Sequence, residues 1–146
     1  MIRLGTAADL GAVTAVYRDA SLSNPGDREH LLAHPEYLVL EPAGLDEGRT
    51  YVAEENGALV GFATWADTGE AIELEDLFVD PGWMRRGIAT ALVDRIADML
   101  RSRGVDAIEV TASADALEFY HAIGFVDVGV EQTAFGTAPH LRLSLT

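Results

Sequence analysis

The chain has 146 residues, of which 49% are hydrophobic, and a formal net charge of −14. This length predicts a single domain over residues 1–146 with a core of its own. No apolar run approaches the roughly 20 residues of a membrane span, and Met1–Thr6 lacks a signal-peptide layout, so we expect a cytoplasmic protein. The chain contains no cysteine and no lysine. This excludes cysteine nucleophiles, lysine Schiff bases and P-loop nucleotide hydrolysis.

The charge is unevenly distributed. Residues 85–104 contain five arginines and two aspartates, although the chain as a whole is acidic. An acidic protein repels nucleic acid and anionic membranes, so we expect neither as a partner. An acidic surface also attracts a cationic substrate, although solubility alone explains the acidity equally well.

The N-terminal half predicts three elements before residue 34. Ile2–Leu4 is expected to form a strand, Thr6 to cap a helix over about residues 7–21, and Asp27–Ala33 to form a short helix. An acidic, glycine-containing loop is expected to follow, as far as Arg49.

A hairpin and a further strand are predicted next. Thr50–Glu55 and Ala58–Trp65 are separated by Asn56-Gly57, a pair that favours a type I′ turn because both residues tolerate positive φ. Ala71–Val79 is expected to be the following strand.

The C-terminal half predicts a β–α–β unit and then a helix and two strands. The helix from about Gly87 to Arg103 precedes the strand Ala107–Thr111, and strands joined by such a crossover are parallel. The later elements are a helix at Ser113–Ala122 and strands at Phe125–Thr133 and His140–Leu145. The whole pattern predicts an α/β (α+β) fold with a mixed, mostly antiparallel sheet of about six to seven strands and flanking helices.

The sequence Asp80-Pro81-Gly82-Trp83-Met84-Arg85-Arg86-Gly87 joins a strand to a helix. The first amides of a helix lack intrahelical partners and lie at the positive end of its dipole, so they bind anions. Two arginines at a helix start oppose the dipole, and an anion between them resolves that conflict better than exposure to solvent does. We therefore expect a diphosphate to bind here.

Two motifs resemble those of the GNAT superfamily of N-acetyltransferases. Gly87 and Ala89 match its Gln/Arg-x-x-Gly-x-Gly/Ala turn, with Met84 in place of Gln or Arg. The segment from Ala116 to Phe125 matches its Ala-x-x-Phe-Tyr-x-x-x-Gly-Phe motif. Ser113 stands where many members have Asn, which weakens an assignment to the pantetheine there. The resemblance covers essentially the whole chain.

This resemblance implies acetyl-CoA (coenzyme A) as the cofactor, bound by the central β–α–β unit. Its pyrophosphate would lie against the amides of the turn, and its pantetheine arm would run along the preceding strand. The residues implied to bind it are Leu77, Phe78, Val79, Met84, Arg85, Arg86, Gly87, Ile88, Ala89 and Thr90.

The resemblance also implies the catalytic groups. Tyr120 would be the general acid that protonates the departing thiolate, although a tyrosine on an amphipathic helix is by itself most often a core residue. Glu73 and Glu75 share one face of their strand, and either is a candidate for the base; a solvated face explains each of them about as well. Glu109 on the neighbouring parallel strand is the third candidate.

The implied function is acetyl transfer to a primary amine by direct attack in a ternary complex. The alternative is a catalytically silent acyl-CoA-binding module. A Rossmann oxidoreductase is disfavoured because Gly82-x-x-x-x-Gly87-x-Ala89 does not match Gly-x-Gly-x-x-Gly.

The acceptor and the partners are less sharply defined. We expect a small cationic amine or a peptide N-terminus as the acceptor, contacted by residues 22–48 and by the hairpin around residues 135–139. Exposed strand edges permit a homodimer. His30, His34 and His121 lack metal-ligand spacing, so no metal is implied.

Overall fold

The computed structural model describes residues 1–133 and 136–146. They form two compact units, the first from residues 1–64 and 76–95 and the second from residues 65–75 and 96–146. The strands are β1 (Ile2–Leu4), β2 (Thr50–Glu55), β3 (Ala58–Asp67), β4 (Ile72–Val79), β5 (Ala107–Thr111), β6 (Val126–Thr133) and β7 (Gly136–Ser144). The α-helices are α1 (Leu10–Leu22), α2 (Pro25–Ala33), α3 (Ala43–Asp46), α4 (Ile88–Ser102) and α5 (Leu117–Ala122).

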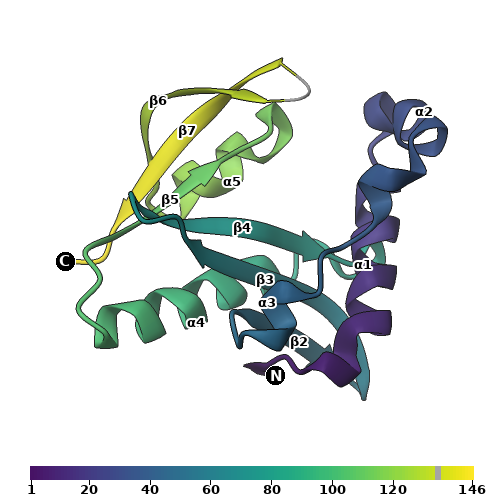
Figure 1. The fold of residues 1–146 in the computed structure, drawn as a ribbon, viewed down its shortest axis with the longest axis horizontal. Coiled ribbons are helices and arrows are strands. Elements are labelled where there is room, and N and C mark those ends of the chain that lie inside the picture. The colour runs from purple at the N-terminus through teal and green to yellow at the C-terminus, as the bar shows by residue number, and fades with distance from the viewer. Residues whose placement is uncertain (134–135) are drawn as a thin grey trace. The chain divides into compact units, whose positions relative to one another are not determined.

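The seven strands follow the hydrogen-bonding order β1-β2-β3-β4-β5-β7-β6, and Figure 1 colours them along the chain. Neighbours are antiparallel at β1–β2, β2–β3, β5–β7 and β6–β7, and parallel at β4–β5. This confirms the predicted mixed, mostly antiparallel sheet, and α4 between the two parallel strands completes the expected β–α–β unit.

The core of the first unit lies between α1 and the β2–β3 hairpin (Figure 1). Val13 and Val16, one helical turn apart, pack with Val52 of β2 and Phe62 of β3. At the tip of the hairpin, Asn56-Gly57 has φ values of 53° and 80°. Both are positive, as the predicted type I′ turn requires.

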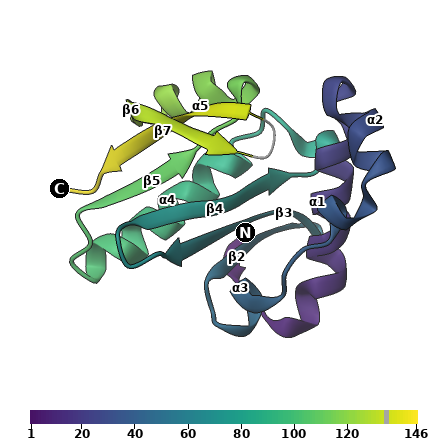
Figure 2. The same ribbon diagram turned by 45° about the horizontal axis from the view of Figure 1, so that its top comes forward.

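The core of the second unit lies on one face of its strands. Ile108 and Val110 of β5 and Leu141 of β7 alternate with polar neighbours and are buried. Figure 2 shows α5 along these strands, and a Cβ built on Gly124 would approach Leu143 Cδ1 at 3.3 Å. The opposite face of the same strands carries polar residues, among them Glu109, Thr111 and His140.

The edge strand β6 carries an exposed apolar stripe. Val126, Val128 and Val130 are 60%, 52% and 71% exposed. Since β6 ends the strand order, its apolar side chains and its unpaired edge suit the homodimer predicted above, which stays a prediction.

The expected loop before Arg49 is the clearest error of the sequence prediction. It contains a 3₁₀ helix at Pro35–Leu38 and the short helix α3. Leu45 of α3 is buried, and a Cβ on Gly44 would come within 2.7 Å of Thr64 Cγ2, so this turn packs tightly against β3. Tertiary packing therefore orders a segment whose composition indicates a loop.

Smaller differences concern element ends. The helix expected from Ser113 begins as a 3₁₀ turn at Ala114–Ala116, before α5. β7 begins at Gly136 rather than His140 because its first residues pair with β6, starting at Gly136 opposite Thr133. Of the hairpin residues expected to contact an acceptor, 136–139 lie in β7, and Phe135 lies outside the described residues. Among the described residues, no helix has the length and apolar character that crossing a membrane requires.

Arg3 links the first strand to two neighbouring elements. Its guanidinium donates to both carboxylate oxygens of Asp9 at 2.9 Å, and it also pairs with Glu54 of β2. The hydrogen bonds from Arg3 lower the pKa of Asp9 from 3.8 to about 2. The ionised carboxylate is therefore more stable in the folded chain than in the unfolded chain.

We expect Arg3→Met to lower the free energy of unfolding by about 1–2 kcal/mol at neutral pH, because Arg3 is partly exposed. In the wild type this contribution is complete above pH 3.8 and is lost as the pH falls through about 2. Urea unfolding between neutral and acid pH tests this. The variant should lose less stability on acidification than the wild type. Asp98→Asn, which breaks the exposed pair with Arg101, is the control and should change stability little.

Candidate functional site

The strand-to-helix turn of the first unit is the first part of the site. β4 ends at Val79, and the amide of Asp80 donates to Val60 O of β3 at 2.8 Å. The side chain of Asp80 accepts from the amide of Gly82 at 2.8 Å and so caps the 3₁₀ helix Pro81–Trp83. These contacts attach the start of the turn to the sheet.

Two residues of the turn before α4 have a left-handed backbone conformation, with positive φ. Arg85 has φ 63° and Gly87 has φ 79°, whereas Arg86 between them does not have positive φ. Alternation of this kind directs successive amides to one side and forms an anion-binding concavity. Arg85 carries a side chain in this conformation, which is sterically costly, so the turn is maintained by its surroundings.

The start of α4 adds further amide donors to this concavity. The first helical hydrogen bond runs from Ala91 N to Gly87 O at 3.0 Å. The amides of Ile88, Ala89 and Thr90 precede it and point out of the helix end. A Cβ built on Gly87 would meet nothing within 4 Å, so the space next to this backbone is open. The turn therefore fits a diphosphate.

The side chains of the turn are arranged around this backbone. Arg85, Arg86 and Met84 are exposed, and the Arg86 guanidinium lies 4.8 Å from the centre of the Trp83 ring. Ile88, by contrast, is buried: a Cβ on Gly61 of β3 would approach its Cγ2 at 3.1 Å. The first helical side chain thus fixes the helix while the arginines remain accessible to an anion.

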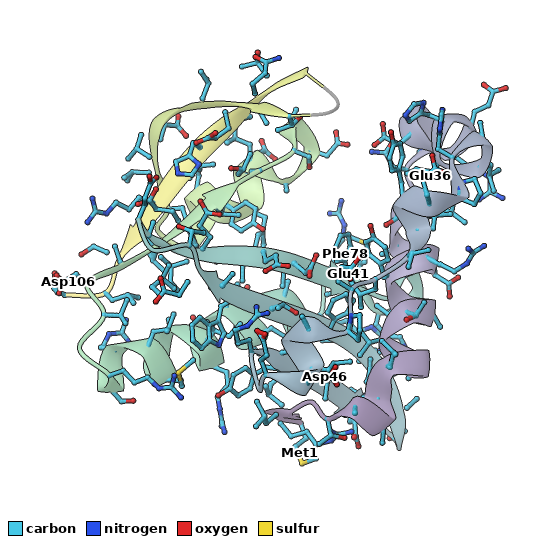
Figure 3. All side chains as sticks on the ribbon, viewed as in Figure 1. Met1, Glu36, Glu41, Asp46, Phe78 and Asp106 are labelled. Carbon is cyan, nitrogen blue, oxygen red and sulfur yellow. The ribbon has the colours of Figure 1, made fainter. Side chains whose placement is uncertain are left out.

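The end of β4 places its side chains on two faces, as its period of two predicts. Phe78, labelled in Figure 3, lies 5.0 Å from the Tyr17 ring and 5.6 Å from the Phe62 ring, measured between centroids. Its ring therefore belongs to the core of the first unit, and any contact of Phe78 with a cofactor is left to its main chain. Leu77 and Val79 are half-buried on the other face.

Tyr17 of α1 was not predicted to be a site residue. Its hydroxyl donates to Tyr37 O at 2.7 Å. Burial raises the pKa of Tyr17, and the negative charge of Asp76 raises it further. Tyr17 thus connects α1, the 3₁₀ helix Pro35–Leu38 and the end of β4.

In the second unit Tyr120 lies in an aromatic cluster. It is 7% exposed, and its ring packs edge-to-face with Phe119 and Phe125 at centroid distances of 5.2 and 5.1 Å. Burial raises the pKa of its phenol to about 12. Phe125 is buried and Phe119 is half-buried, and the phenol stays protonated at neutral pH.

The three candidate bases also belong to the second unit. Glu73 is half-buried and Glu75 is exposed, on the same face of β4. Glu109 of β5 is the register partner of Glu73, so the two stand side by side on adjacent parallel strands. Glu109 accepts a hydrogen bond from His140 Nε2 at 2.6 Å. His140 was not predicted to be a site residue. The only indication in the sequence was a polar residue at the start of a strand with alternating apolar residues.

The other histidines lie on the surface. His34 pairs with Glu36 at 3.0 Å and His121 with Asp127 at 2.8 Å, and the two histidines are 44% and 42% exposed. The His30 and His34 rings lie 4.7 Å apart between centroids, with an angle of 45° between their planes. Within residues 1–133 and 136–146, no group of three or more His, Asp or Glu side chains has the arrangement of a metal site.

Residues 40–141 match the family model described as an acetyltransferase (GNAT) domain. The chain is 34% identical over 90 residues to an uncharacterized N-acetyltransferase of Methanocaldococcus jannaschii, covering 55% of this chain and 40% of that protein. It is 35% identical over 114 residues to the mycothiol acetyltransferase of Beutenbergia cavernae, covering 67% and 38%.

A third relative is the [ribosomal protein bS18]-alanine N-acetyltransferase of Escherichia coli, 31% identical over 86 residues, with 57% of this chain and 58% of that protein covered. The chain thus spans about two fifths of the first two relatives and under two thirds of the third.

Two solved structures show the same fold. A GCN5-related N-acetyltransferase from Rhodopseudomonas palustris superposes with a TM-score of 0.79 at 21% identity, covering 99% of this chain and 94% of that chain. The PaiA N-acetyltransferase of Thermoplasma acidophilum, solved in complex with coenzyme A, gives 0.73 at 16% identity and covers 99% and 98%.

Proposed function

Since the chain belongs to the acetyltransferase (GNAT) domain family, we propose that it is an enzyme, an acetyl-CoA-dependent N-acetyltransferase that acts on a primary amine. The observation that carries the proposal is the amide concavity formed by Arg85, Gly87 and the start of α4. The single-domain and cytoplasmic assignments made from the sequence stay predictions.

The first unit contains the residues proposed to hold acetyl-CoA. The amides from Met84 to Thr90 would bind its pyrophosphate, with Arg85 and Arg86 supplying positive charge. The main chain of Leu77–Val79 would bind the pantetheine arm as an added strand. When bound, acetyl-CoA supplies an activated acyl group as a thioester. The Thermoplasma acidophilum structure, which has the same fold, is a complex with coenzyme A and supports this choice of cofactor.

The second unit contains the residues proposed to move protons. Tyr120 would donate its phenolic proton to the departing sulfur, and one of Glu73, Glu75 and Glu109 would accept a proton from the incoming ammonium. A phenol with a pKa of about 12 gives up its proton only as negative charge develops on the sulfur. Direct attack by the neutral amine then needs no covalent enzyme intermediate.

The acceptor is proposed to be a cationic small amine or a peptide N-terminus. The name of one relative, [ribosomal protein bS18]-alanine N-acetyltransferase, supports a peptide or protein amine as the acceptor. The net charge of −14 favours a cation.

A thiol-release assay tests the proposal. The purified protein, acetyl-CoA and a panel of polyamines, amino acids, aminoglycosides and short peptides should release free coenzyme A with at least one acceptor. Calorimetry with acetyl-CoA alone runs in parallel. Binding without thiol release across the panel would favour the silent acyl-CoA-binding module, and absence of binding would refute both functions.

The high pKa of Tyr120 also predicts the shape of the pH profile. Because its phenol ionises only near pH 12, deprotonation of Tyr120 should not lower the rate between about pH 6 and pH 10. The profile of kcat in that range should therefore rise to a plateau and show no descending limb. A descending limb centred near the ordinary phenol value of about 10 would contradict the assignment.

A further inference from the structure

The polar face of the second unit brings together side chains from three strands. Strand register places Thr111 of β5 opposite His140 of β7, and Glu73 of β4 beside Glu109 of β5. Alternation along β5 puts Glu109 and Thr111 on the same face, while the residues between and before them are buried in the core. Glu73, Glu109, Thr111 and His140 therefore share one face.

His140 is fixed in place at both ring nitrogens. Its Nε2 lies 2.6 Å from Glu109 Oε1 and its Nδ1 lies 3.1 Å from Thr111 Oγ1, and the residue is only 8% exposed. A carboxylate only accepts, so Nε2–H donates to Glu109, and in the neutral ring the Thr111 hydroxyl donates to Nδ1. Thr111, His140 and Glu109 form one chain of hydrogen bonds that ends at a carboxylate.

The charges around this chain are mostly negative. Glu131 of β6 approaches His140 Nδ1 at 3.9 Å, and Glu73 of β4 is the register partner of Glu109. One positive charge lies close by: Arg142 of β7 is the register partner of Glu109, and its side chain is exposed. An ammonium group is the ligand that such a face attracts, and a carboxylate held on it is positioned to take the ammonium proton.

Glu109 is held by the ring of a buried histidine. Glu75 is exposed on its strand, and Glu73 is half-buried. Glu109 is 26% exposed at its side chain and receives a short, charge-assisted hydrogen bond from a buried ring. A base that is oriented by a third group keeps one geometry, which proton transfer requires.

We propose that Glu109 is the catalytic base and that His140 is the residue that positions it. The inference rests on the proposed function. One ammonium proton passes to the Glu109 carboxylate, and the freed nitrogen lone pair forms the C–N bond as the C–S bond breaks. Tyr120 protonates the sulfur and regains a proton from the new amide nitrogen, and Glu109 releases its proton to water. The net products are the amide, free thiol and one proton.

The test compares pH profiles of kcat/KM with the acceptor found in the thiol-release screen. Glu109→Gln should lose the ascending limb and lower turnover by about 10²–10⁴-fold, while Glu73→Gln and Glu75→Gln should keep the limb. His140→Leu should keep the limb but lower kcat/KM by about tenfold, because the carboxylate loses the hydrogen bond that holds its orientation. His140→Gln retains an N–H donor and should restore part of kcat/KM.

A second histidine provides the matched control. His121 makes the same kind of pair with Asp127 at 2.8 Å, but on the exposed surface. His121→Leu should leave kcat/KM unchanged. Acetyl-CoA affinity and thermal unfolding of every variant identify any that are misfolded.

Two results would overturn the inference alone. The first is loss of the limb in the Glu73 or Glu75 variant with the limb kept in Glu109→Gln. The second is an unchanged kcat/KM in folded His140→Leu, or no recovery of kcat/KM in folded His140→Gln. Failure of the wild type to release thiol with any acceptor would instead overturn the proposed function, and the inference with it.

Discussion

Tyr120→Phe is expected to lower kcat by about 10²–10⁴-fold while leaving acetyl-CoA affinity nearly unchanged. Phenylalanine keeps the edge-to-face packing with Phe119 and Phe125, whose centroids lie 5.2 and 5.1 Å away, so only the proton donor is lost. The initial rate of thiol release at saturating substrate gives kcat, and calorimetry gives the affinity for acetyl-CoA. A loss confined to kcat is the signature of a group that acts in the transition state.

Tyr51→Phe is the control for this experiment. Tyr51 is also a buried phenol, 8% exposed, with the Arg95 guanidinium 5.6 Å from the centre of its ring. Removing its hydroxyl should leave kcat unchanged. If Tyr120→Phe lowers rate and affinity by the same factor, or if the fall in rate follows a fall in thermal stability, Tyr120 has a packing role only.

Gly87→Glu is expected to weaken acetyl-CoA binding by about tenfold or more, which corresponds to at least about 1.4 kcal/mol. The new side chain would enter the open space beside the amide concavity and bring a negative charge to the position proposed for the pyrophosphate. Calorimetric titration with acetyl-CoA measures the effect. Gly87→Ala, without the charge, should weaken binding less.

Gly57→Glu controls for the backbone strain that any side chain suffers here. Gly57 has φ 80° against 79° for Gly87, and a Cβ at either position would meet nothing within 4 Å. The two glutamates should therefore lower stability by a similar amount, about 1–2 kcal/mol. Equal acetyl-CoA affinity for the Gly57 and Gly87 variants would show that the turn does not hold the cofactor.

The elements of the fold that local patterns control were predictable from the sequence. Asn56-Gly57 forms its turn because two adjacent residues tolerate positive φ, and strands at Ile2–Leu4, Thr50–Glu55 and Ala107–Thr111 have the predicted bounds. The segment before Arg49 was wrongly expected to be a loop, because the burial of Leu45 and the close approach at Gly44 depend on β3, far along the chain.

The candidate site also has parts that were predictable from the sequence and parts that were not. The anion-binding turn follows from a strand, a Pro-Gly pair and a helix start within a few residues, and Tyr120 follows from a contiguous motif. The positive φ of Arg85 was not predictable, because a non-glycine residue adopts it only when its surroundings enforce it.

The sequence by itself determined the family, the order of the strands and of the longer helices, the position of the turn between β4 and α4, and a set of three candidate carboxylates among which it did not choose. Only the tertiary structure placed His140 against Glu109, because residues that are 31 positions apart meet through the antiparallel register of β5 and β7. Periodicity along a chain reports which face of a strand a residue occupies. It does not report which residue of another strand stands beside it, since that depends on long-range pairing.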